Sequence, residues 1–256
     1  MGDVALAGWL AGRRALLCYG LMGDAVARLG LDYMDAHAEW LAAQGARVEV
    51  LRVPTSNAIE ANGAVLREAL VAEEAGALVV AHSKGGVDAL AGLVHDDAMA
   101  RCAAFLAFQS PFLGTPVADV SVEAAPLMGI AKIALPLLGS GDAAGIHDLT
   151  TAAREAWMAA HAEAVAELTR RVRVVTIGTD FTPRLRLGRD THLAPLAMWL
   201  RERAGPNDGL VPVASALLPG ARHLVESGSH VALIIRAADH APEAALERAL
   251  RAALAD

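Results

Sequence analysis

Ala81-His82-Ser83-Lys84-Gly85 joins an apolar run, residues 77–80 (ALVV), to a helical pattern over residues 86–93 (GVDALAGL). The apolar run is typical of a buried strand, and the apolar residues after it recur at helical spacing of three and four. A strand, a sharp turn and a helix with a serine at the apex form the context of a nucleophile elbow. Such a turn imposes strained backbone angles on Ser83, so Ala81 and Gly85, two positions away on either side, have to be small. The stretch therefore predicts an α/β fold with Ser83 exposed at its functional edge.

Ser83 has a second interpretation, as the N-cap of the helix that follows, which is a common place for serine. Lys84 argues against it, because the helix dipole disfavours a cation in the first turn. Lysine is also scarce in this chain, where Lys132 is the only other one. We favour the nucleophile, and the N-cap serine is the alternative.

The composition is that of a folded domain with a large core. The chain has 256 residues, 55% of them hydrophobic, and a formal net charge of −7. Its mean hydropathy of +0.38 argues against disorder. The negative charge argues against a nucleic-acid partner, which requires a basic face. The two cysteines, Cys18 and Cys102, lie in or beside apolar runs, so we expect buried free thiols.

The N-terminal region does not resemble a secretory signal. Asp3 precedes the apolar start and Arg13-Arg14 follows it, which reverses the charge order of a signal peptide. The most apolar internal stretch, residues 124–138, is interrupted by Lys132 and Pro136 and is too short to span a bilayer. We predict no transmembrane segment and a cytoplasmic protein, with a secreted protein whose signal has been removed as the alternative.

Strand and helix patterns alternate along most of the chain. Besides the run before Ser83, strands are expected at residues 14–19, 48–53, 103–108, 173–178 and 221–226, and helices at residues 25–43, 56–75, 211–218 and 243–254. A long polar loop is expected over residues 179–203. This alternation predicts a mostly parallel central sheet flanked by helices.

Residues 117–161 are rich in Ala and Leu and have no strand pattern, so we expect them to form a helical cap insertion within a single domain, residues 1–256. Functional sites of such sheets form at the carboxyl ends of the strands. The insertion is therefore expected to cover Ser83. Its apolar residues line an acyl-binding groove or a lid in one interpretation, and pack permanently on the sheet in the other.

A serine nucleophile needs a general base and an acid that orients the base. Of nine histidines, His230 stands out, because it follows the last predicted strand on a loop at the carboxyl edge of the sheet. Asp208 lies in the turn Pro206-Asn207-Asp208-Gly209. The order Ser83, Asp208, His230 is the one expected of an α/β-hydrolase triad.

Other roles remain open for these side chains. His230 is alternatively a capping or surface histidine, and Asp208 a turn residue bonded to its own backbone. Asp180 is the rival acid. His82, next to Ser83, is expected to point to another side of the turn and to have a structural role.

The chain resembles bacterial lipases and esterases of the α/β-hydrolase superfamily over most of its length. Its Ala-x-Ser-x-Gly elbow is similar to that of small bacterial lipases and of some poly(3-hydroxybutyrate) depolymerases. The other matching stretches are Gly20-Leu21-Met22-Gly23, residues 110–119 (SPFLGTPVAD), Asp148-Leu149-Thr150, residues 207–212 (NDGLVP) and Gly228-Ser229-His230.

The resemblance implies a role for each matching residue. It implies that Ser83 is the nucleophile, that His230 is the general base and then the acid, and that Asp208 orients it. The backbone N–H groups of Leu21 and Lys84 then form the oxyanion hole, where preformed donors stabilise developing charge. Residues expected to bind substrate are Met22, Phe112, Met128 and Ile133.

Two positions depart from the family pattern. Tyr19 stands where these lipases commonly have His before the first glycine of the oxyanion loop, which puts the support of that loop in question. Phe112 stands where a polar residue is common.

The expected activity is hydrolysis of a carboxylic ester with an apolar acyl group through an acyl-enzyme, with a small-molecule or lipid ester as the partner. We predict no cofactor and, since no acidic pair suits a structural calcium, no metal. No oligomeric state is predicted. The alternatives are a thioesterase, a polyhydroxyalkanoate depolymerase, an amidase or peptidase, and a non-catalytic homologue that binds an apolar ligand.

Overall fold

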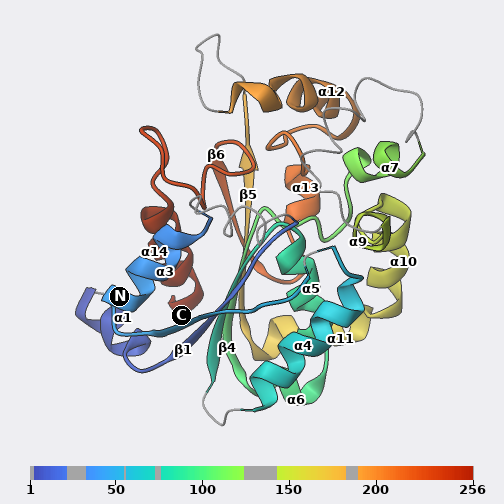
Figure 1. Ribbon diagram of the computed structural model, residues 1–256. Coiled ribbons are helices and arrows are strands. Elements are labelled where there is room, and N and C mark those ends of the chain that lie inside the picture. Colours follow the sequence, from blue (N-terminus) through green and yellow to red (C-terminus); the bar gives the residue numbers. More distant parts are fainter. Residues whose placement is uncertain are drawn as a thin grey trace.

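The protein is built around a six-stranded sheet in which all neighbouring strands are parallel (Figure 1). The structure, a computed structural model, describes residues 3–21, 33–54, 56–72, 76–123, 143–182 and 190–255. The strand order is β2-β1-β3-β4-β5-β6. The strands are β1 (Arg14–Cys18), β2 (Arg47–Val50), β3 (Ala77–His82), β4 (Cys102–Phe108), β5 (Arg173–Asp180) and β6 (Arg222–Ser227). The predicted parallel sheet and all six predicted strands are confirmed.

Successive residues of the central strands belong to two different cores. In β3, Val79 and Ala81 enter one core cluster, whereas Leu78 and Val80 enter the other. Side chains alternate between the faces of a strand, so a near-continuous apolar run buries both faces of a parallel sheet. The sheet is therefore covered on both sides.

Helices cover each face, as Figure 1 shows. One layer contains α4 (Ile59–Val71), α5 (Lys84–Leu93), α6 (Asp96–Met99) and α11 (Ala162–Arg171), and the opposite layer contains α1 (Asp3–Leu10), α3 (Asp35–Ala43) and α14 (Pro242–Leu254). Beyond the carboxyl ends of the strands lie α7 (Pro116–Glu123), α9 (Ala143–His147), a 3-10 turn η1 (Thr191–Leu193), α12 (Ala194–Ala204) and α13 (Val213–Ala216). The site is therefore expected at this edge.

Two expectations about local structure were wrong. The predicted polar loop over 179–203 contains helix α12, whose buried residues Leu196, Ala197 and Leu200 share one face. Pro195 lies in the first turn of this helix, where its missing N–H breaks no hydrogen bond within the helix. The helix predicted over residues 25–43 is not continuous, because Met34 adopts a left-handed conformation with φ 61° and α3 begins only after it, at Asp35. Residues 25–32 lie outside the described residues.

The predicted insertion is helical where it is described, in α7, α9 and α10 (Thr151–Ala160); residues 124–142 lie outside the described part. It contacts the start of α4, because Asp148 Oδ2 accepts the N–H of Ile59 at 2.8 Å and Gly145 donates to the carbonyl of Ser56 at 3.1 Å. Asp148, 89 residues away in sequence, thus satisfies the N-terminus of α4.

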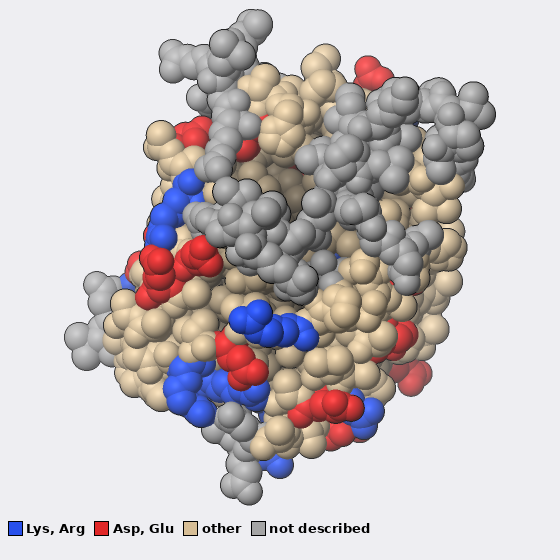
Figure 2. Space-filling view, viewed as in Figure 1, with Lys and Arg blue, Asp and Glu red and all other residues tan. Residues whose placement is uncertain are grey.

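Both cysteines are free and buried, as predicted. Burial raises the pKa of both thiols, to about 12 for Cys102, so they are inert at neutral pH. Among the described residues, no helix is both long and apolar enough to cross a bilayer. On the face seen in Figure 2, basic and acidic side chains lie beside one another and do not gather by sign.

Helix α5 buries an ion pair directly behind the elbow. Lys84 Nζ lies 2.6 Å from Asp88 Oδ1, and Asn62 donates to Asp88 Oδ2 at 2.9 Å. Lys84 is completely buried. Burial raises the pKa of Asp88 to about 6, against the lowering effect of Lys84 and Asn62. Removing these two charges from water costs free energy, so each buried charge is stable only while its partner is present.

We expect Asp88→Leu to lower the free energy of unfolding by about 3–5 kcal/mol, because it leaves the ammonium of Lys84 buried and uncompensated. Urea unfolding followed by circular dichroism measures this loss. Asp97→Ala, which breaks the exposed pair with Arg67 at 2.8 Å, is the matched control and should leave the midpoint almost unchanged. Equal effects of the two substitutions would contradict the account of the buried pair.

Candidate active site

Ser83 lies at a strained turn between β3 and α5. Its backbone has φ 54° and ψ −130°, a region that non-glycine residues rarely occupy. A Cβ on Gly85 would lie 2.4 Å from the carbonyl oxygen of Cys18, so the turn requires glycine there. The side chain of Ser83 makes no capping hydrogen bond to α5. The N-cap interpretation is therefore wrong, and the expected strain and small neighbour are confirmed.

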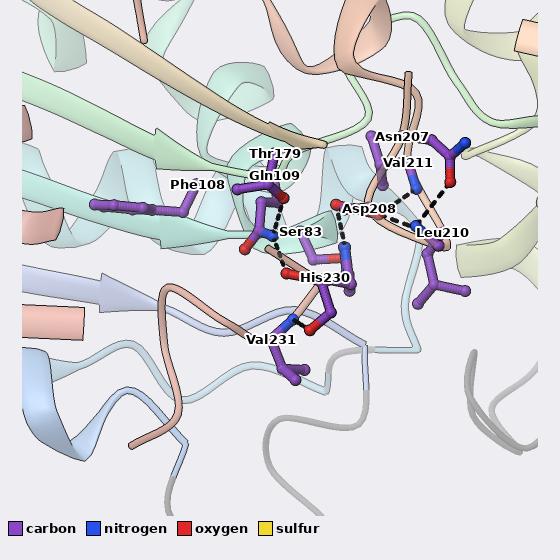
Figure 3. A network of polar contacts seen from close by, with 12 residues as sticks. Ser83, Phe108, Gln109, Thr179, Asn207, Asp208, Leu210, Val211, His230 and Val231 are labelled. Carbon is purple, nitrogen blue, oxygen red and sulfur yellow. Dashed lines mark hydrogen bonds and ion pairs between the residues drawn. The ribbon is translucent and has the colours of Figure 1, made fainter. Parts of the chain in front are cut away.

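The hydroxyl of Ser83 instead meets His230 (Figure 3). Ser83 Oγ lies 2.9 Å from His230 Nε2, and His230 Nδ1 lies 2.8 Å from Asp208 Oδ2. Ser83 and His230 closely follow β3 and β6, and Asp208 lies in the turn between α12 and α13, within the connection from β5 to β6. Residues separated by up to 147 positions are therefore joined in one continuous chain of hydrogen bonds.

Asp208 uses its two carboxylate oxygens for different purposes. Oδ1 accepts the backbone N–H groups of Leu210 at 2.8 Å and Val211 at 2.7 Å, while Oδ2 faces His230. The carbonyl of Asp208 also accepts the N–H of His230 at 2.9 Å. The bonding of the aspartate to its own turn, which we considered as an alternative, is thus present together with the contact to His230. The turn fixes the direction of the carboxylate.

The alternatives for the base and the acid are not supported by the geometry. His230 is only 6% exposed, so it is not a surface histidine. Asp180, the rival acid, pairs with Arg201 at 2.5 Å. His82 points away from the hydroxyl of Ser83, toward Tyr33 and the backbone of His230.

Both predicted oxyanion donors belong to segments that adjoin Ser83. Lys84 is the first residue of α5, where backbone N–H groups have no acceptor within the helix. Gly20, just before Leu21, packs against the elbow so closely that a Cβ there would lie 2.7 Å from the Cβ of Ser83. The backbone before Leu21 is therefore held next to the serine.

The predicted substrate-binding residues are only partly described. Phe112 is fully buried, and its ring meets Phe105 edge-on, with centroids 6.5 Å apart, in a core cluster. In this position Phe112 packs in the core and presents no surface to a ligand. Met22, Met128 and Ile133 lie outside the described residues.

Gln109 is a site residue that we did not predict. It has φ 53° and zero exposure, directly after β4. Its Nε2 donates to Thr179 Oγ1 at 2.5 Å and to the carbonyl of Ser229 at 2.6 Å (Figure 3). Gln109 therefore fixes the loop that carries His230. Its position at the carboxyl end of a central strand was the only signal in the sequence.

We expect Gln109→Gly to be more stable than Gln109→Ala by about 1–2 kcal/mol, because only glycine adopts a positive φ without strain. Both variants lose the same two hydrogen bonds, so they differ in the strain of the positive φ, in one buried Cβ and in the backbone freedom of glycine. Urea unfolding of the two variants side by side measures the difference. An alanine variant as stable as the glycine variant would show that the positive φ stores no strain.

A second buried network lies beside His230. Asp190 Oδ2 accepts the hydroxyl of Ser229 and lies 3.1 Å from His240 Nε2. No sequence pattern connected these three residues. Asp190 therefore anchors the side chain of Ser229, the residue before His230. Across the described residues, no group of three or more His, Cys, Asp or Glu side chains is arranged to hold a metal ion.

Comparison with solved structures defines the class of fold. The chain is similar to the lipase BlEst2 of Bacillus licheniformis in its mature form, with a TM-score of 0.67 and 21% identity over 86% of this chain and 85% of that one. It is also similar to the metagenomic carboxyl esterase MGS0156, with a TM-score of 0.68 and 24% identity over 95% and 74% of the two chains. Lipase 1 of Pelosinus fermentans gives a TM-score of 0.62 at 12% identity over 94% and 98%.

The protein thus has the α/β-hydrolase fold, and the predicted likeness to bacterial lipases and esterases is confirmed at the level of the fold. No protein-family model matches the sequence, and no curated protein matches it. Only the geometry of the site therefore points to an activity more specific than the fold.

Proposed function

We propose that the protein is a serine hydrolase that cleaves carboxylic esters with an apolar acyl group through an acyl-enzyme intermediate. The observation that carries the proposal is the continuous contact from Ser83 Oγ to His230 Nε2 and from His230 Nδ1 to Asp208 Oδ2, at 2.9 and 2.8 Å. These distances lie within the hydrogen-bond reach that a nucleophile and its base require.

The proton positions follow from the partners. Asp208 Oδ2 accepts, so Nδ1 of His230 carries the proton, and Nε2 is left as the acceptor for the hydroxyl of Ser83. On attack, the Oγ–C bond forms and Nε2 takes the hydroxyl proton. The same nitrogen then donates that proton to the departing alkoxide as the C–O bond breaks. Water, deprotonated by Nε2, hydrolyses the acyl-enzyme and regenerates Ser83.

The negative charge on the former carbonyl oxygen needs donors beside Ser83. The N–H groups of Lys84 and Leu21 are the proposed donors, supported by the position of Lys84 at the start of α5 and by the contact of Gly20 with Ser83. The helix dipole of α5 adds to the stabilisation of an anion at this point. One such donor contributes about 2.7–4 kcal/mol in comparable sites.

The ester class is supported by the solved structures of similar fold, whose names are lipase and carboxyl esterase. The described part of the predicted insertion includes α7 and α9, which lie beyond the carboxyl ends of the strands. We propose the insertion, with Met128 and Ile133, as the source of the apolar acyl pocket. On this proposal the insertion acts as a cap over Ser83.

Hydrolysis of p-nitrophenyl esters of increasing acyl length tests the proposal. We expect release of p-nitrophenol with a burst equal to the amount of enzyme if hydrolysis of the acyl-enzyme is the slower step, and a preference for apolar acyl groups over acetate. Heat-unfolded protein is the control for hydrolysis by surface nucleophiles. Binding of the ester without turnover would favour the non-catalytic homologue.

A further inference from the structure

A chain of hydrogen bonds runs behind the elbow from the oxyanion loop to the backbone of His230. The N–H of Gly20 lies 3.0 Å from the hydroxyl of Tyr33, which lies 2.7 Å from His82 Nδ1. His82 Nε2 in turn lies 2.8 Å from the carbonyl oxygen of His230. All of these groups are buried.

Only one arrangement of protons satisfies every member of this chain. The amide of Gly20 can only donate and the carbonyl of His230 can only accept, so His82 must carry its proton on Nε2. Nδ1 of the neutral imidazole is then an acceptor, and the hydroxyl of Tyr33 donates its proton to it. Burial lowers the pKa of His82 well below its usual value, and the nearby His230 lowers it further. His82 is therefore neutral and has a single tautomer.

Both ends of the chain are parts of the proposed catalytic machinery. Gly20 immediately precedes Leu21, and a Cβ on Gly20 would lie 2.8 Å from the hydroxyl of Tyr33. At the other end, the imidazole of His82 also packs against that of His230, with ring centroids 4.8 Å apart. The buried imidazole of His82 therefore contacts the ring of His230 and also binds the backbone carbonyl of His230.

We propose that Tyr33 and His82 are positioning residues that set the oxyanion loop and the general base relative to each other. The inference rests on the proposed function, since it assigns these residues to the same reaction. Neither side chain touches Ser83 Oγ in the described contacts, so neither is a catalytic residue. They hold the N–H of Leu21 and Nε2 of His230 at the positions that the reaction requires relative to the acyl carbon of the substrate.

Tyr33→Phe is the sharpest test, because it removes one hydroxyl and keeps the ring. We expect the rate of acylation, measured as p-nitrophenol release with enzyme in excess, to fall about 10- to 100-fold, as small misplacements of reacting groups do. KM should change less than about twofold, since no contact with substrate is lost. Fluorophosphonate labelling of Ser83 should slow by a similar factor.

Thr176→Val is the matched control. Thr176 is a fully buried residue of β5 whose hydroxyl accepts the N–H of Leu218 at 3.3 Å, so this change also orphans one backbone donor. We expect it to lower the unfolding temperature, although less than Tyr33→Phe, which removes two buried hydrogen bonds, and to keep the acylation rate within about twofold. His82→Leu provides a second variant should Tyr33→Phe fail to fold, and should show the same selective loss of acylation.

The double variant Tyr33→Phe/His82→Leu should be no slower than the worse single variant, because the two residues act as one unit. If Ser83→Ala abolishes hydrolysis but Tyr33→Phe acylates as fast as Thr176→Val, the positioning role is overturned and the proposed function stands. Equal hydrolysis by the wild type and Ser83→Ala would instead overturn the proposed function.

Discussion

Ser83→Ala is expected to reduce kcat for ester hydrolysis by about a million-fold, the scale observed when a triad nucleophile is removed. The reason is chemical. Without Oγ no acyl-enzyme forms, and His230 has no nucleophile to activate. The fold should be retained, because Oγ makes a single hydrogen bond within the described part of the chain and does not cap α5.

Steady-state assays with the purified variant measure this loss, with circular dichroism and thermal unfolding as checks on the fold. Thr176→Val serves here as the control for a lost buried hydroxyl and should remain active. A Ser83→Ala protein that is folded and retains more than about a hundredth of the activity would contradict the nucleophile assignment, since the residual catalysis of triad variants is far smaller.

Asp208→Asn is expected to lower kcat by about ten-thousand-fold with little loss of stability, as in a comparable triad. The turn determines how the amide would sit. Because the N–H groups of Leu210 and Val211 both donate to Oδ1, the amide oxygen must remain at that position and the NH2 must occupy the position of Oδ2. The NH2 would then donate to His230 Nδ1.

This reversed hydrogen bond places the proton of His230 on Nε2, which can no longer accept from Ser83. Asp180→Asn is the matched control, since Asp180 is an acid at the same edge of the sheet that pairs with Arg201. It should keep kcat within a few-fold of the wild type. A larger loss in Asp180→Asn than in Asp208→Asn would make Asp180 the orienting acid.

The architecture was predictable because its signals are local. Apolar runs between helical patterns indicated all six strands, and small residues around Ser83 indicated the sharp turn. Ser83 and His230 each follow a strand, Asp208 lies in the connection between two strands, and the carboxyl ends of parallel strands meet at one edge. That topology allowed three residues far apart in the sequence to be placed together.

The remaining contacts depend on partners that no local pattern reveals. Asp148 satisfies the start of α4 from another part of the chain, and Gln109 reaches the loop of His230 only after the sheet has formed. The helix predicted over residues 25–43 includes Tyr33, whereas in the structure Tyr33 precedes α3 by two residues. The sequence pattern therefore gave no reason to place its hydroxyl at the site. The sequence pattern predicted a polar loop in place of helix α12, because the helix has few buried apolar residues and lies within a polar stretch.

Fluorophosphonate labelling followed by intact mass measurement and peptide mapping tests the central claim most directly. The reagent reacts with a serine only where a base activates it and an oxyanion site accepts the phosphonyl oxygen. We predict one adduct per chain, on the peptide that contains Ser83, and no adduct in Ser83→Ala. An adduct on another serine, or none on a protein that hydrolyses esters, would contradict the account.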